Sequence, residues 1–183
     1  MNSVPARLLA ILAASLALTA CVAPTRIESN TAGGIDIAPE KLFVFSHIGR
    51  EFGDGFYEPF LNRFSARLTV CGVRSAITTV GDLDLDNGVH TGKMKAFDPD
   101  YTMVIRRTGG TRMDFGRVIH AVYDVQLAQA QAPAFKAVWR ANVNFFRGGT
   151  AIPIANRGEA LANDVVDKMI ADGVLKNCPV PSK

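Results

Sequence analysis

The densest group of possible metal ligands is the acidic run Asp82–Gly88 (DLDLDNG). Its three carboxylates stand at alternate positions, the spacing at which the first half of a calcium-binding loop presents oxygen atoms. Such a loop also needs glycine at its sixth position and glutamate at its twelfth, where this chain has Asn87 and Lys93. We therefore favour a solvated acidic turn in which an Asp or Asn caps a short helix. A calcium-dependent binding module remains the alternative.

The residue types that serve in catalysis show no motif spacing. His47, His90 and His120 have no cysteine, histidine or carboxylate partner at zinc-ligand spacing. The G-x-S-x-G motif, the P-loop and the paired-glycine dinucleotide motif are absent. We predict a protein with no catalytic residues, no metal and no cofactor. An enzyme whose site is assembled from residues distant in sequence is the alternative.

Cys21 ends a stretch that has the composition of an export signal. Arg7 is followed by the apolar run Leu8–Leu18, which is shorter than the roughly 20 residues needed to span a bilayer. Leu18–Cys21 (LTAC) resembles the bacterial lipobox at every position. That resemblance implies lipid transfer to the thiol of Cys21, cleavage before it, and acylation of the new amine. Residues 1–20 are thus expected to be a lipoprotein signal peptide.

The lipid on Cys21 also predicts where the protein resides. One acyl chain binds a membrane marginally, whereas two or more give a stable anchor. By resemblance to the sorting rules of enteric bacteria, the non-acidic Val22 favours the outer membrane. We expect a palmitate-bearing lipoprotein on the periplasmic face of the outer membrane, with an envelope protein as its partner.

Length and charge indicate one domain that does not bind nucleic acid. The chain has 183 residues and 48% apolar residues, which fits a single globular unit. Its 20 basic residues nearly balance 17 acidic ones, so no basic surface for phosphates is expected. Proline and paired glycines make residues 21–40 read as the lipidated cysteine and a flexible tether, with residues 41–183 as the domain.

Hydrophobic periodicity predicts five strands and two main helices. The strands are expected at 42–48, 75–80, 101–107, 118–128 and 135–145. The helices are expected from Glu58 to Cys71 and from Glu159 to Asp172, with a brief helix at 89–97. A glycine turn at 108–110, flanked by Arg106, Arg107 and Arg112, is expected to be a hairpin tip.

This order of elements predicts an α/β (α+β) two-layer sandwich. A strand-helix-strand unit implies a parallel pair with a right-handed crossover. The last two strands alternate between apolar and polar residues, so one face of the mixed sheet should be solvated and both main helices should pack on the other.

Three stretches carry a resemblance to a known group of proteins: Phe97–Ile105 (FDPDYTMVI), Tyr123–Leu127 (YDVQL) and Phe135–Val143. They resemble the third strand and the hairpin of the periplasmic lipoprotein domains of the curli-secretion and penicillin-binding-protein-activator type. They also resemble the amino-terminal domain of the Tol system's propeller protein. The resemblance covers most of residues 42–175 and implies an accessory role in envelope assembly or transport, without assigning any site residue.

The polar side of the last two strands is the predicted contact face of the domain. Alternation places Trp139, Tyr123 and Phe135 on the core side. The residues expected on the solvated side, as a surface for an envelope protein, are His120, Gln126, Lys136, Arg140, Asn142 and Asn144.

The two cysteines other than Cys21 are predicted to form a disulfide, Cys71–Cys178, because the periplasm is oxidising. Each follows the carboxyl end of a main helix. The bond needs the Cα atoms within about 7 Å, which requires the two helices to be parallel. They are parallel if residues 82–100 form a crossover and antiparallel if that stretch is a hairpin loop. We favour the crossover, because nineteen residues are long for a loop without structure.

Overall fold

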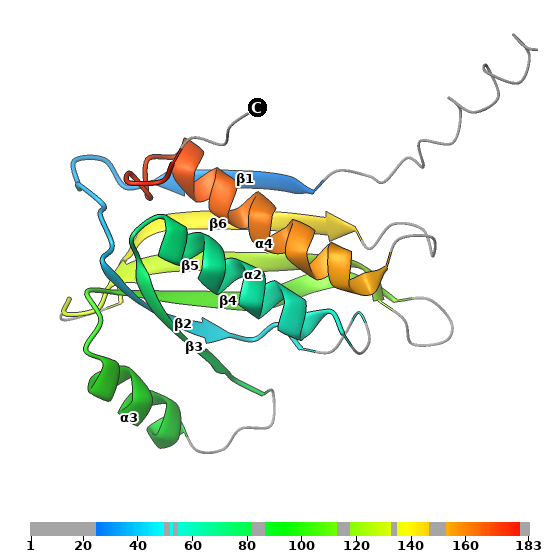
Figure 1. Cartoon of the computed structure of the whole chain (residues 1–183), viewed down its shortest axis with the longest axis horizontal. Coiled ribbons are helices and arrows are strands. Elements are labelled where there is room, and N and C mark those ends of the chain that lie inside the picture. The colour runs from blue at the N-terminus through cyan, green and yellow to red at the C-terminus, as the bar shows by residue number, and fades with distance from the viewer. Residues whose placement is uncertain are drawn as a thin grey trace, which may run out of the picture.

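The structure, a computed structural model of the chain, describes residues 25–49, 52, 55–81, 87–112, 118–132, 135–146 and 153–179. A six-stranded mixed sheet carries two long helices across one face (Figure 1). The strands are β1 (Arg26–Thr31), β2 (Lys41–Ser46), β3 (Arg74–Thr79), β4 (Tyr101–Arg112), β5 (Val118–Gln129) and β6 (Ala137–Phe146). The helices are α2 (Tyr57–Val70), α3 (Asn87–Phe97) and α4 (Ile154–Ala171).

The strands lie in the order β1-β6-β5-β4-β2-β3. Strand β2 is parallel to both of its neighbours, β3 and β4, and every other pair is antiparallel. The predicted mixed α/β sandwich with α2 and α4 on one face is therefore confirmed. Most bounds lie within two residues of those predicted, but β4 extends to Arg112, and α4 begins at Ile154, directly after Pro153, rather than at Glu159.

Strand β1 is the sixth strand, which the sequence did not predict. Residues 26–31 were expected to be flexible tether, but they pair along the edge of β6, from Arg26 opposite Asn144 to Thr31 opposite Trp139. Without β1, the backbone N–H and C=O groups on that edge of β6 would lack partners. The tether prediction is thus wrong for this segment, and the ordered domain begins well before residue 41.

Helix α3 packs on the sheet face opposite to α2 and α4, at its β2–β3 side. The Phe97 ring lies 6.0 Å from the ring of Phe43, whose sequence neighbours Leu42 and Val44 face the main core. Both crossovers from this parallel region are right-handed by rule, but one moves outward from β2 to β3 and the other moves back past β2 to β4. The reversal puts α3 on the other face, so the expectation that helices cover one face only is wrong here.

The glycine pair after Arg107 does not form the predicted hairpin tip. Strand β4 continues to Arg112, with a register shift against β5 between Arg107 and Gly109. Gly110 has φ +134°, and a Cβ there would overlap the carbonyl oxygen of His120. The bulge therefore falls at Thr108, and the two glycines pair with Val122 and Ala121 in the continuing strand, where they let β5 approach closely, rather than forming a turn.

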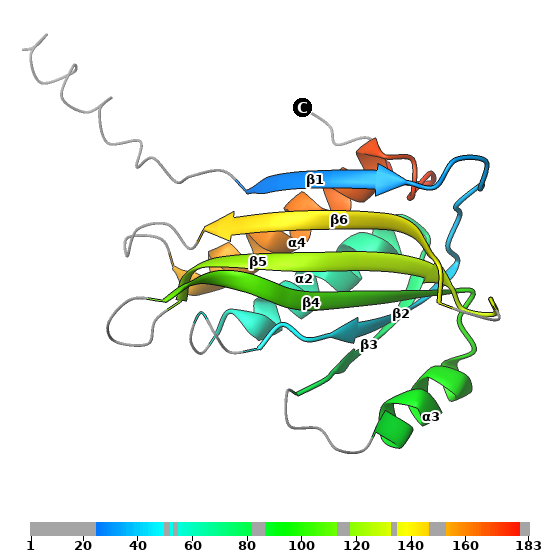
Figure 2. The ribbon, with the colours of Figure 1, turned by 180° about the vertical axis from the view of Figure 1, so that it is seen from behind.

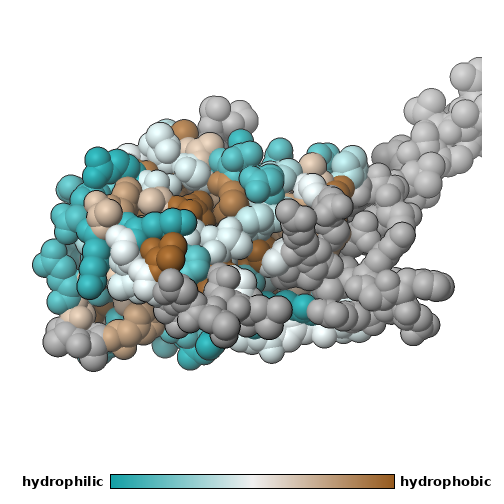
Figure 3. All heavy atoms as spheres, turned by 90° about the horizontal axis from the view of Figure 1, so that it is seen from below, coloured by the Kyte–Doolittle hydropathy of each residue, from teal (hydrophilic) through white to brown (hydrophobic). Residues whose placement is uncertain are grey.

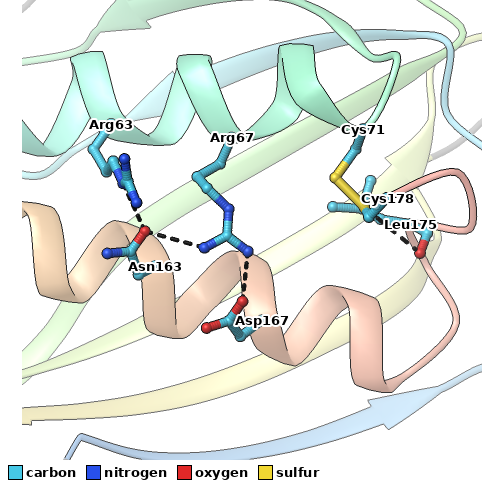
Figure 4. Close-up of polar contacts among 7 residues, drawn as sticks. All are labelled: Arg63, Arg67, Cys71, Asn163, Asp167, Leu175 and Cys178. Carbon is cyan, nitrogen blue, oxygen red and sulfur yellow. Dashed lines mark hydrogen bonds and ion pairs between the residues drawn. A yellow bond between two sulfur atoms is a disulfide. The ribbon is translucent and has the colours of Figure 1, made fainter. Parts of the chain in front are cut away.

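Helices α2 and α4 run parallel and are held together along their length (Figure 4). The Nε of Arg63 donates to Oδ1 of Asn163 at 2.8 Å, and one guanidinium nitrogen of Arg67 lies 2.5 Å from Asp167. At their carboxyl ends the Cα atoms of Cys71 and Cys178 are 4.1 Å apart in a disulfide. The structure therefore has the crossover topology that the sequence favoured. The Cys71–Cys178 disulfide, which depends on that topology, is formed as predicted.

At their amino ends the two helices are in backbone contact. A Cβ on Gly158 of α4 would overlap the carbonyl oxygen of Phe56 and lie 3.1 Å from the backbone nitrogen of Phe60. Rings of Phe52, Phe56 and Phe145 pack beneath this contact, with centroids 4.8–5.6 Å apart. Only glycine fits at position 158 while α2 and α4 stay this close.

We expect Gly158→Ala to destabilise the fold by about 1–3 kcal/mol, because backbone atoms must move to admit the methyl group. Gly92→Ala is the matched control. Gly92 lies within α3 with no atom within 4 Å of an added Cβ, so alanine should stabilise the fold by up to about 1 kcal/mol. Urea unfolding followed by circular dichroism measures both. Equal effects of the two substitutions would contradict the close helix contact.

Candidate functional site

The side of β1, β6 and β5 that faces away from α2 and α4 is the largest uncovered part of the sheet (Figure 2). Cross-strand pairs place the polar residues of the three strands side by side, with Glu28 opposite Asn142 and Asn142 opposite Asp124. We use the name open face for this surface, comprising Glu28, Asn30, His120, Asp124, Gln126, Arg140, Asn142, Asn144 and Phe146.

Asp124 is the centre of a polar network on the open face. Its carboxylate accepts a hydrogen bond from Arg140 Nε at 2.7 Å and one from Gln126 Nε2 at 2.5 Å. Arg106 of β4 lies 4.0 Å away. Although it stands on an uncovered face, Asp124 is only 4% exposed. A buried carboxylate is costly unless it is paired, so these neighbours account for its place in the sheet.

Arg140 presents the charge of this network to solvent. Its side chain is 63% exposed while it bonds to Asp124. The hydrogen bond and the charge of Asp124 raise the pKa of the Arg140 guanidinium. Asp124 and Arg140 therefore form a fixed ion pair. The guanidinium donors that Asp124 does not use are available to a molecule that contacts the open face.

A shallow hollow of about 310 Å³ lies beside this ion pair. It is lined by Glu28, Ser29, Asn30, Asp124, Arg140 and Asn142. The hollow thus offers carboxylate and amide oxygens together with amide and guanidinium donors. Such a lining suits a hydrogen-bonded contact with polar groups of a partner rather than an apolar ligand.

An aromatic pair lies at the end of the open face, away from the hollow. The rings of His120 and Phe146 are stacked with centroids 4.4 Å apart, and Phe146 is 37% exposed. His120 Nε2 is buried and has no hydrogen-bond partner among the described residues. An exposed aromatic ring on the same face as a polar hollow is a combination found at protein contact surfaces.

Strand β1 is fixed in place from the opposite side of the sheet by Asp172, just after α4. Asp172 Oδ2 accepts from Ser29 Oγ at 2.6 Å and from Trp139 Nε1 at 2.8 Å, and Oδ1 accepts from Lys168 Nζ at 2.8 Å. Burial by itself raises the pKa of Asp172, but the hydrogen bonds from Lys168, Ser29 and Trp139 outweigh it and lower the pKa. This contact positions the strand that carries Glu28 and Asn30.

Most of the predicted contact residues meet on the open face. His120, Arg140, Asn142 and Asn144 lie there together, whereas Lys136 is exposed just before β6 begins. Sequence reasoning missed Glu28 and Asn30, because their segment was assigned to the tether. The alternation of polar and apolar residues in RIESNT (residues 26–31) could have predicted a strand there. It was overlooked because the alternating stretch is short.

Several other predicted site residues fall outside the part of the chain that the structure describes. Asp82, Asp84 and Asp86 lie outside the described residues, as does Cys21. His90 Nδ1 is 2.9 Å from Thr78 Oγ1. Across the described ranges, no three His, Cys, Asp or Glu side chains gather as a metal site. Among the described helices, none is both long and apolar enough to cross a membrane.

The surface seen from the β3 edge differs from the open face (Figure 3). Hydrophilic side chains gather at the end of the molecule that carries α3, and apolar residues show as small separate patches between polar ones. No broad apolar surface is visible among the coloured residues of this view. The open face, by contrast, combines a polar hollow, a fixed ion pair and an aromatic pair on one side of the described molecule.

No protein-family model matches the sequence, and no curated protein is significantly similar to it. A solved structure shares its fold at low sequence identity. A point variant of PelC from Paraburkholderia phytofirmans, solved as a dodecamer, has a TM-score of 0.51 at 9% identity, covering 85% of this chain and 99% of that one. Another PelC dodecamer from that organism has a TM-score of 0.49 at 10% identity, over 85% and 99% of the two chains. Lipoprotein GNA1162 from Neisseria meningitidis has 0.44 at 14% identity, over 73% and 99%.

We expect Asp172→Asn to weaken the fold at neutral pH by about 1–2 kcal/mol, because Lys168, Ser29 and Trp139 lose a charged acceptor. The lowered pKa means that Asp172 stabilises the native state above its ordinary value of 3.8, and that this contribution is lost as pH falls through the native pKa. The difference between variant and native protein should therefore shrink below about pH 4.

Urea unfolding at a series of pH values measures this effect. Asp167→Asn is the control, because Asp167 is 56% exposed and its surface ion pair with Arg67 should contribute under about 1 kcal/mol. A stability difference for Asp172→Asn that persists unchanged in acid would contradict the lowered pKa.

Proposed function

We propose that this protein is a lipid-anchored, non-enzymatic interaction module of the cell envelope, on the periplasmic face of the outer membrane. The open face is its contact surface for an envelope protein. The observation that carries the proposal is that exposed Arg140 and Asn142 line a hollow on an uncovered sheet face, with exposed Phe146 at the end of the same face.

Two further observations support an envelope location. Leu18–Cys21 has the lipobox pattern, and Cys71 pairs with Cys178. Structural disulfides persist in oxidising compartments such as the periplasm and are rare in the cytosol. The fold shared with PelC adds that a chain of this architecture assembles into a dodecamer in that protein.

We expect Asn142→Arg to weaken partner binding by about tenfold or more, which corresponds to about 1.4 kcal/mol. Asn142 is exposed, and its described side-chain bond is accepted from Asn144 at 2.8 Å, so the larger side chain should fill the hollow without disturbing the core. This choice spares the Arg140–Asp124 pair, whose loss would leave a buried carboxylate with fewer partners. A photo-crosslinking residue at Asn30 in native envelopes, with mass spectrometry, identifies and quantifies the partner.

Asn62→Arg, on the exposed surface of α2, is the matched control and should leave crosslinking unchanged. Thermal unfolding of both variants should match the native protein. If Asn62→Arg abolishes binding and Asn142→Arg does not, the partner contacts the helices and the open face is not the site. A crosslinked product made of two copies of this chain would identify the partner as the protein itself.

We expect Cys21→Ala to abolish lipid attachment and leave the precursor uncut, because the thiol receives the diacylglycerol. Incorporation of labelled palmitate and vesicle flotation measure this. Cys71→Ala is the control: it removes the disulfide but keeps Cys21, so palmitate should still enter. Labelling of the Cys21→Ala variant would show that the anchor lies elsewhere.

A further inference from the structure

Both main helices begin at the same end of the sheet, the end from which the chain leads back to Cys21. The start of β1 lies there because Arg26 pairs with Asn144 near the end of β6. Arg157, in the first turns of α4, donates to the carbonyl oxygen of Phe146, and Gly158 contacts the start of α2. We define this proximal end by Arg26, Phe56, Phe146 and Ile154.

The chain between the lipidated cysteine and β1 is short. A chain extends by at most roughly 3.6 Å per residue, so residues 21–26 span no more than about 18 Å. The sequence had suggested a tether through residue 40, which would let the domain turn freely above the membrane. Because β1 begins at Arg26, only residues 21–25 of that stretch precede the sheet.

From Arg26 the 6 residues of β1 run for about 20 Å toward the opposite end of the sheet. That distal end carries Thr31, which pairs with Trp139, and the Cys71–Cys178 disulfide at the carboxyl ends of α2 and α4. A lipid on Cys21 thus holds the proximal end close to the bilayer surface. The distal end lies one strand length farther along the chain.

We propose that the proximal end faces the bilayer and contacts the phosphates of its lipid headgroups, so that the sheet stands upright on the membrane. This inference rests on the lipid anchor of the proposed function. It adds a second partner, the phospholipid surface, at a place distinct from the hollow of the open face.

The chemistry of the proximal end agrees with a phosphate surface. A helix amino terminus carries unpaired N–H groups and a partial positive charge equivalent to about half an elementary charge. The N-cap residues of the two helices, Phe56 and Pro153, make no side-chain capping bond; among the described residues, the first turn of α4 holds no acid, and that of α2 holds only Glu58. Arg26 is exposed at the same end of the sheet, on the side of the open face, and the 37% exposed Phe146 suits the headgroup boundary.

The alternative orientation rests the β1 edge on the membrane, and it places both ends of β1 at equal height. Two labelling sites separate the orientations. Asn156 is exposed in the first turn of α4 at the proximal end. Gly33 is exposed just past the distal end of β1, and an added Cβ there meets no atom within 4 Å.

The test uses the full-length acylated protein in vesicles of phosphatidylethanolamine and phosphatidylglycerol. Asn156→Cys and Gly33→Cys are each labelled with a fluorophore, and the vesicles carry a headgroup-attached nitroxide quencher. We expect quenching at Asn156 to exceed that at Gly33 by several fold. A flexible glycine-serine insert of about ten residues before Thr25 should reduce the quenching at Asn156.

Equal quenching at both positions, or stronger quenching at Gly33, overturns the upright orientation. Unchanged quenching at Asn156 after the insert overturns the short connector as its cause. Vesicle flotation and the mass of the acylated chain report separately on the anchor. If the protein carries no lipid and does not float, the anchor fails and the orientation fails with it. If it floats but the two probes do not differ, only the orientation fails.

Discussion

Helices α2 and α4 run in the same direction across one face of the sheet, and much of the molecule's organisation follows from that alignment. The two right-handed crossovers make β4 parallel to β2, and two antiparallel steps then return β6 to the same direction. Helix α4 must therefore run back along the sheet as α2 does. Matching ends then meet: Gly158 packs on the start of α2, and Cys178 bonds to Cys71 beyond its end.

The same handedness leaves the two faces of the sheet unlike. One face is filled by α2 and α4, and α3 covers only the β2–β3 side of the other, where Phe97 meets Phe43. Strands β1, β6 and β5 thus keep a solvated face at the opposite side of the sheet. On it, Asp124 is buried by its own hydrogen-bonding neighbours rather than by a helix, which gives the open face a fixed charge pattern.

We propose different places for membrane attachment and partner contact: the proximal end for the first and the hollow of the open face for the second. In that proposal the short connector before β1 brings the helix amino termini toward the lipid, whereas the hollow lies on the side of the sheet. A sheet that stands upright leaves the open face perpendicular to the membrane, where a neighbouring envelope protein reaches it from the side. Asp172 serves both arrangements, because its bond to Ser29 fixes the strand that bounds the hollow and begins at the connector.

Local pattern in the sequence was enough for the elements with strong periodicity. Alternation predicted β5 and β6 and the meeting of Arg140 with Asn142, and helical spacing predicted α2 and the body of α4. Two cysteines in a chain expected to be exported, with a crossover expected between them, predicted the disulfide. These features depend on which side chains recur every second residue or every turn, and that information is local.

Tertiary structure decided the remainder. Strand β1 has too few apolar residues for its alternation to predict a strand. It is ordered because the edge of β6 offers hydrogen bonds. Phe135 shares the apolar phase of Trp139, yet it is 56% exposed because it precedes the strand. The Gly109–Gly110 pair has the local pattern of a turn, but β4 continues through it in register with Val122 and Ala121 of β5. For β1 and for the glycine pair, strands distant in sequence supply the hydrogen bonds, and no local pattern encodes those partners.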